Sequence, residues 1–80
     1  MSDEFLRKLY EMSDGDYKIF DRYRVGSEVG LSNSQTDDII EDLHNMGLIK
    51  KIGETKILMT LEGKQETEKS TEFELFMLLI

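Results

Sequence analysis

The stretch "LSNSQTDDIIEDLHNMGLI", residues 31–49, decides the fold of this chain. Ser32 followed three residues later by Gln35 is a capping box, in which each side chain bonds the other residue's backbone at a helix start. Inward-facing residues then recur at helical spacing: Thr36, Ile39, Ile40, Leu43 and Met46. Gly47 follows as a left-handed residue that ends a helix. The pattern predicts a helix from Asn33 to Met46.

The residues before this helix predict two shorter elements and one amphipathic helix. Asp21 is placed to cap a short helix that reaches Val29, and Gly30 is a left-handed stop after it. The preceding "YKIF", residues 17–20, is typical of a short strand. Further upstream, Phe5, Leu9 and Met12 form the apolar stripe of a helix within residues 2–12.

The residues after the helix predict a hairpin. "LIKKI" reads as a strand, "GET" at 53–55 as a turn and "KILMT" as the returning strand. We expect Ile52, Ile57 and Met59 to share one face of this hairpin. Thr60 can then cap a further helix from Leu61. The predicted class is therefore α+β, mostly helical, with a small antiparallel hairpin and a C-terminal helix.

The segments "VGSEVGLSNSQTDDIIEDLHNMGLIKK" and "MTLEGK" resemble the winged-helix (winged helix-turn-helix) DNA-binding superfamily, of the prokaryotic transcription-regulator type. The resemblance covers residues 2–69. It implies a winged-helix domain at 1–69, and the apolar residues that follow predict a helical segment at 70–80 that serves packing or dimerisation. It also implies a transcriptional regulator that reads duplex DNA with its third helix and its hairpin wing.

Carried onto this sequence, the resemblance assigns candidate DNA-binding residues. The start of the third helix would lie nearest the bases, and basic residues of the second helix and the wing would contact phosphates. The candidates are Arg22, Arg24, Ser32, Asn33, Ser34, Gln35, Lys50, Lys51 and Lys56. The three lysines have an alternative reading as protection of an edge strand against aggregation.

The acidic residues of the third helix favour a different partner. Asp37, Asp38, Glu41 and Asp42 make residues 33–49 strongly negative, with no Lys or Arg among them, and the whole chain carries a net charge of −7. Carboxylates facing phosphates oppose binding to a polyanion. The alternative is an acidic module that binds a basic protein through Asp37, Asp38 and Glu41, or a helix face that simply maintains solubility.

The remaining features limit the classes of function. The single His44 has no evident catalytic partners, Cys is absent, and no nucleotide or metal motif occurs, so we expect no enzyme, cofactor or metal. No segment is apolar for the length of a membrane span, and we expect a cytoplasmic protein. Seven of the last eight residues are apolar, which predicts either packing onto the first helix or a homodimer through Phe73, Phe76, Met77 and Ile80.

Overall fold

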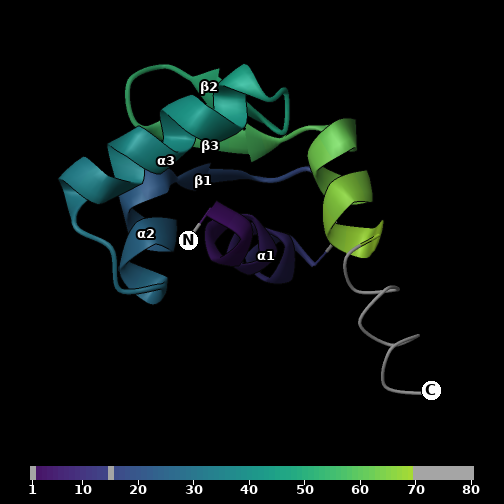
Figure 1. Cartoon of the computed structure of the whole chain (residues 1–80), viewed down its shortest axis with the longest axis horizontal. Helices are drawn as coiled ribbons and strands as arrows, with labels where there is room; N and C mark the ends of the chain where they lie inside the picture. The colour runs from purple at the N-terminus through teal and green to yellow at the C-terminus, as the bar shows by residue number, and fades with distance from the viewer. Residues whose placement is uncertain (1, 15, 70–80) are drawn as a thin grey trace.

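The computed structural model describes residues 2–14 and 16–69. Its elements in chain order are α1 (Ser2–Ser13), β1 (Ile19–Asp21), α2 (Arg22–Glu28), α3 (Asn33–Asn45), β2 (Ile49–Ile52) and β3 (Lys56–Met59). A further helix covers residues 61–69, at the end of the sheet (Figure 1). The α+β class, the hairpin and the helix after it are confirmed.

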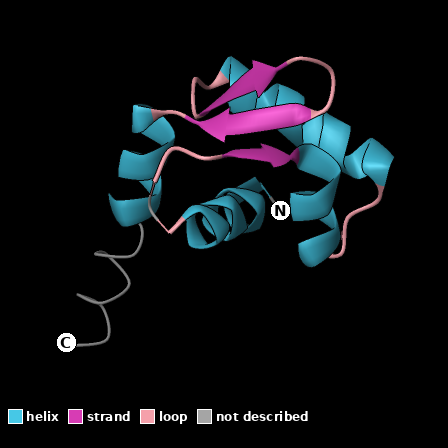
Figure 2. Ribbon diagram, turned by 180° about the vertical axis from the view of Figure 1, so that it is seen from behind, coloured by secondary structure: helices cyan, strands magenta, loops and turns pink. Residues whose placement is uncertain are grey.

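The three strands form one antiparallel sheet in the order β1-β3-β2. Ile57 of the central strand pairs with Phe20 on one side and Lys51 on the other. Because directly paired residues share a face, this row points toward the helices, together with the buried pair Ile49 and Met59. No described helix covers the opposite face, which is seen from behind in Figure 2.

One core joins the helices to the covered face of the sheet. Leu9 of α1, Ile40 and Leu43 of α3, and Ile57 of β3 are buried in a single cluster, as the sequence pattern predicts. Further members come from α1, α2, α3 and the hairpin, namely Phe5, Leu6, Val25, Ile39, Leu48, Ile49 and Met59. The core therefore fixes α3 against the hairpin, which positions the surface described below.

Helices α2 and α3 pack closely because a glycine lies at their contact. A Cβ atom at Gly26 would lie 2.0 Å from Thr36 Oγ1, inside van der Waals contact. Thr36 is itself fully buried, and its hydroxyl donates a hydrogen bond of 2.8 Å to the Ser32 carbonyl. The turn between the helices uses Gly30 at φ 75°, the left-handed conformation predicted for it.

Two predictions about apolar positions are wrong. Met46 is 61% exposed, because α3 ends at Asn45 and Met46 is its C-cap, one residue beyond the helix. Ile52 pairs with Lys56 and therefore lies on the sheet face opposite to Ile57 and Met59. Met46 lies where the helix has ended, whereas Ile52 keeps the alternation of β2 and its face is set by the register with β3.

The helix at 61–69 is tied to the rest of the domain at both ends. The Thr60 hydroxyl accepts a hydrogen bond of 3.1 Å from the Gly63 backbone N–H, which is the predicted cap, and donates one of 2.7 Å to the Gly47 carbonyl. Near the other end, Tyr10 Oη donates to Glu68 Oε2 at 3.2 Å. The helix therefore connects the end of the hairpin to α1.

Candidate functional site

The first turn of α3 is exposed and begins with the predicted capping box. Ser32 Oγ accepts from the Gln35 N–H at 3.2 Å, and Gln35 Oε1 accepts from the Ser32 N–H at 3.0 Å. The Ser32 hydroxyl oxygen and the Gln35 carbonyl oxygen are thereby occupied, whereas the side chains of Asn33 and Ser34 hydrogen-bond to none of the described residues. Of the four candidate DNA-binding residues in this turn, Asn33 and Ser34 are the freest to bind a ligand.

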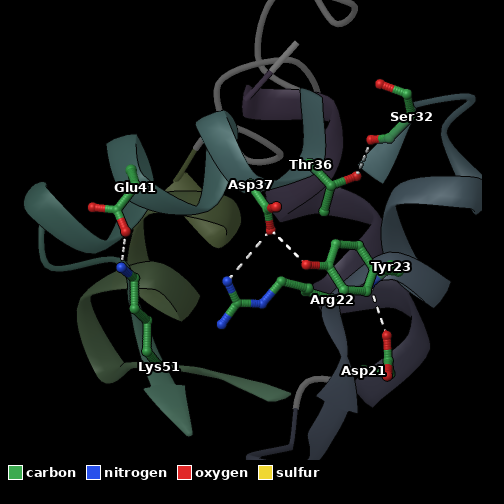
Figure 3. Close-up of polar contacts among 8 residues, drawn as sticks. All are labelled: Asp21, Arg22, Tyr23, Ser32, Thr36, Asp37, Glu41 and Lys51. Atoms are coloured by element: carbon green, nitrogen blue, oxygen red, sulfur yellow. Dashed lines mark hydrogen bonds and ion pairs between the residues drawn. The ribbon is translucent and has the colours of Figure 1, made fainter. Parts of the chain in front are cut away.

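Asp37, one turn further along α3, binds side chains of α2. Tyr23 Oη donates a hydrogen bond of 2.9 Å to Asp37 Oδ1, and Arg22 Nη1 lies 3.6 Å from the same oxygen (Figure 3). The hydrogen bond to the Asp37 carboxylate, with some loss of hydration, raises the pKa of the Tyr23 phenol. Asp37 therefore joins two helices and does not point freely outward.

Arg22 requires a correction to the predicted phosphate contacts. The residue is only 7% exposed, its side chain is directed at Asp37, and its Nε atom is buried without a hydrogen-bond partner among the described residues. A guanidinium in that position cannot reach a phosphate outside the domain. The burial follows from the position of Arg22 as the first residue of α2, directly after the N-cap Asp21 and beside the sheet.

Glu41 makes a second ion pair from α3, to Lys51 of β2 (Figure 3). Lys51 lies on the covered side of the sheet and reaches α3 from the edge strand. The ion pair occupies one predicted phosphate contact and one predicted protein-binding acid. Together the contacts of Asp37 and Glu41 hold α3 to α2 on one side and to the hairpin on the other.

Asp38 and Asp42 are the other two acids of α3. Both are exposed, and neither forms an ion pair or hydrogen bond with a side chain of the described residues. They stand one helical turn apart, on the same exposed surface of the helix. The uncompensated charge of α3 is therefore carried by two carboxylates, half of the number in the sequence.

The other predicted cations are dispersed. Lys50 pairs with Leu58 across the sheet, so it lies on the uncovered face, away from Glu41 and α3. Lys56 lies on that same face and is 3.9 Å from Asp21 Oδ2. Arg24 is exposed on α2 and pairs with no acid among residues 2–14 and 16–69. The structure does not bring these cations together into one strip beside α3.

Tyr23 is the site residue that the sequence did not indicate. Its hydroxyl meets Asp37 across 14 positions of the chain, and nothing local to "DRYR" distinguishes it from a surface tyrosine. The nearest signal is its position two residues after the N-cap Asp21, whose side chain accepts from the Tyr23 N–H at 2.9 Å. That bond fixes the start of α2, and the phenol then extends toward α3.

Other kinds of site find no support in the part of the chain described. None of its helices has the length and apolar character needed to cross a membrane, and it contains no cluster of three potential metal ligands among His, Asp and Glu. The predicted dimerisation residues Phe73, Phe76, Met77 and Ile80 lie outside the described residues.

No family model matches the chain, and neither the curated proteins nor the solved structures give a match.

Proposed function

We propose that the chain is a small transcriptional regulator that binds duplex DNA with α3 and the hairpin. The observation that carries the proposal is the fixation of α3 between α2 and β2 by Asp37 and Glu41. A helix that enters the major groove must hold its first turn in a defined orientation to contact base edges. These contacts leave Asn33 and Ser34 exposed at the start of such a fixed helix.

The same contacts reduce the electrostatic objection to DNA binding. Arg22 and Lys51 compensate Asp37 and Glu41 within the domain, so these acids oppose phosphates less than free carboxylates do. Asp38 and Asp42 remain repulsive. They weaken non-specific binding, so that only a site that offers compensating contacts is held. Phosphate contacts would fall to Arg24, Lys50 and Lys56, the exposed cations of α2 and the hairpin.

Fluorescence anisotropy with mixed-sequence duplexes at low salt tests the proposal. The variant Asp38→Asn/Asp42→Asn should bind more tightly than the parent, since two repulsive charges are removed while the contacts of Asp37 and Glu41 stay intact. The variant Lys50→Ala/Lys56→Ala should bind more weakly, and its salt slope should fall by about one unit for each lysine that contacts a phosphate in the parent. A matched control, Glu11→Gln on α1, should change neither value. Absence of binding by both parent and Asn variant would exclude the DNA function.

A second function is favoured by the free carboxylates themselves. Asp38 and Asp42 present two uncompensated charges one turn apart, which suits a basic protein surface as well as it disfavours DNA. On this alternative the Asn variant loses affinity for the protein partner, whereas on the DNA proposal it gains affinity for duplexes. Either function is consistent with a cytoplasmic location, which we propose for the chain.

A further inference from the structure

The uncovered face of the sheet combines three apolar side chains with three charged ones. Its residues, called here the outer sheet face, are Ile19, Asp21, Lys50, Ile52, Lys56 and Leu58. Ile19 is 56% exposed, and Ile52 and Leu58 are only half-buried, because no described helix covers this face (Figure 2). Ile19 and Leu58 are directly paired, so they form one continuous apolar row across two strands.

The charges around this row have a defined sign. Lys50 continues the Ile19–Leu58 row on β2, and Lys56 stands beside it in the next row. Only Lys56 has an acid nearby, with Asp21 at 3.9 Å, and Lys50 pairs with none of the described residues. The outer sheet face therefore suits a ligand that is apolar and carries negative charge. In this it differs from the chain as a whole, whose net charge is −7.

The sequence of the chain contains one segment with that composition. Residues 72–80 read "EFELFMLLI", with seven apolar side chains and the two acids Glu72 and Glu74 at its start. We propose that the outer sheet face is the docking site for residues 72–80 of a second copy of the chain. Apolar side chains of the segment would cover Ile19, Leu58 and Ile52, while its two carboxylates meet Lys50 and Lys56. The docked segment and the phosphate contacts proposed for these two lysines therefore compete for the same side chains.

The course of the chain before this segment favours a second copy over the same one. The helix at 61–69 starts at the end of β3 and reaches α1, where Tyr10 holds Glu68. Helix α1 packs with α2 and α3 on the covered side of the sheet, so the chain is led away from the outer sheet face (Figure 1). To return, it must retrace about 13 Å of helix and pass a layer spacing of about 10 Å. The four steps from residue 69 to residue 73 span at most about 14 Å, which is too short for that path.

Sedimentation equilibrium of the full chain tests the docking. The parent should form a dimer in the micromolar range. The variant Ile19→Thr/Leu58→Thr keeps residues suited to a strand but removes the apolar row, and its dimer should dissociate roughly tenfold more readily or more. Met46→Thr, which removes an equally exposed apolar residue from another surface, should dimerise like the parent. A parent that stays monomeric at high micromolar concentration overturns the proposal.

Complementation separates docking on the sheet from pairing of two C-terminal segments. The variant Phe73→Ser/Phe76→Ser should not dimerise alone, but its intact sheet face should accept the segment of the Ile19→Thr/Leu58→Thr variant. A mixture of the two should therefore associate more strongly than either variant alone. If the segments pair with each other instead, the sheet variant dimerises as well as the parent and mixing restores nothing, which rejects the outer sheet face.

Charge reversal gives an independent test at the exposed lysines of the outer sheet face, in case circular dichroism shows that the threonine variant does not fold. Lys50→Glu/Lys56→Glu and Glu72→Lys/Glu74→Lys should each weaken dimerisation, since each creates like charges across the contact. Mixing the two variants should recover the association. Dissociation constants unchanged by either reversal, or unrecovered on mixing, contradict the docking.

Discussion

At the scale of single residues, the carboxylates of α3 have two different roles. Asp37 and Glu41 hold the helix in place through Tyr23, Arg22 and Lys51, whereas Asp38 and Asp42 face solvent. The sequence shows four equivalent acids on one helix, because the spacing i, i+1, i+4, i+5 says nothing about which of them meet a neighbouring element. Only the packing of α2 and β2 against α3 distinguishes the roles.

The hydrogen bond between Tyr23 and Asp37 should be visible in a titration of the phenols. The pKa of Tyr23 is raised mainly by the hydrogen bond to Asp37, and the pKa of Tyr10 mainly by loss of hydration, with Glu68 adding to it. In absorbance at 295 nm, Tyr23→Phe should remove one component that titrates above the ordinary value of about 10. Asp37→Asn should shift that component to lower pH. No shift in the Asn variant would show that the carboxylate does not hold the phenol.

The sign of the accompanying stability change follows from linkage. Folding raises the pKa of both phenols, so the folded state favours their protonated forms. This contribution is fully present below the unfolded value of about 10 and is lost as the pH rises through the folded values. We expect the free energy of unfolding to fall in that alkaline range, and to fall less steeply in Tyr23→Phe. Urea denaturation at pH 8 and at pH 11 measures the difference.

Leu43 tests the core at the same scale. It is 1% exposed within the cluster, and Leu43→Ala should cost about 2–5 kcal/mol through reduced burial and a cavity. Met46→Ala, three residues later on the same sequence pattern, should change stability by less than about 0.5 kcal/mol, since Met46 is exposed. Chemical denaturation of both variants distinguishes them. Equal costs would contradict the end of the buried stripe at Leu43.

At the scale of elements, local signals predict the helices well and the strand faces less well. The capping box at Ser32 and the left-handed glycines at 30 and 47 fix where α3 begins and ends, and both signals act within a few residues. The face of Ile52 depends on pairing with β3, and that pairing depends on the turn at 53–55. Lys50 and Lys51 illustrate the same limit, because the register, and not their chemistry, decides which of the two lies on the face toward α3.

The contact of α2 with α3 should be sensitive to a single methyl group. Gly26→Ala places a Cβ against Thr36 Oγ1, and we expect a loss of about 1–3 kcal/mol from overpacking. In the double variant Gly26→Ala/Thr36→Ala the clash with Oγ1 is removed, so the loss should be smaller than the sum of the single changes. Glu28→Ala, exposed on the same helix, is the control. Additive losses would show that the two residues do not press on each other.

At the scale of the whole molecule, contacts between distant parts of the chain close the domain. The helix at 61–69 packs so tightly on the hairpin that a Cβ at Gly63 would lie 2.1 Å from the Leu48 carbonyl oxygen. Gly63 and Leu48 are too far apart in the sequence to occur in one short window. From its local sequence, Gly63 therefore looks like an ordinary glycine of a polar helix. The same reason hides the ion pair of Glu41 with Lys51.

Gly63→Ala should therefore loosen the C-terminal helix while the rest of the fold persists. The obstacle is backbone, which cannot rotate away as a side chain does, so the helix must shift from Leu48. Hydrogen exchange should show reduced protection at 61–69 and retained protection in α3. Glu62→Ala, exposed on the same helix, should leave both unchanged. Uniform loss of protection would mean that the helix and the core unfold as one unit.

The adjacent lysines of β2 also have a consequence for how the hairpin forms. A misfolded competitor in which β2 slips by one residue would bring Lys50 toward Glu41 in place of Lys51, and the electrostatic attraction would scarcely distinguish the two states. What penalises the slipped state is Ile49, which would leave the core for water, and the breaking of the Thr60 hydroxyl's bond to the Gly47 carbonyl. If the burial of Ile49 and this hydrogen bond were both weakened, the slipped hairpin would lie close in energy to the native one. The chain would then fold more slowly, because the slipped hairpin acts as a kinetic trap.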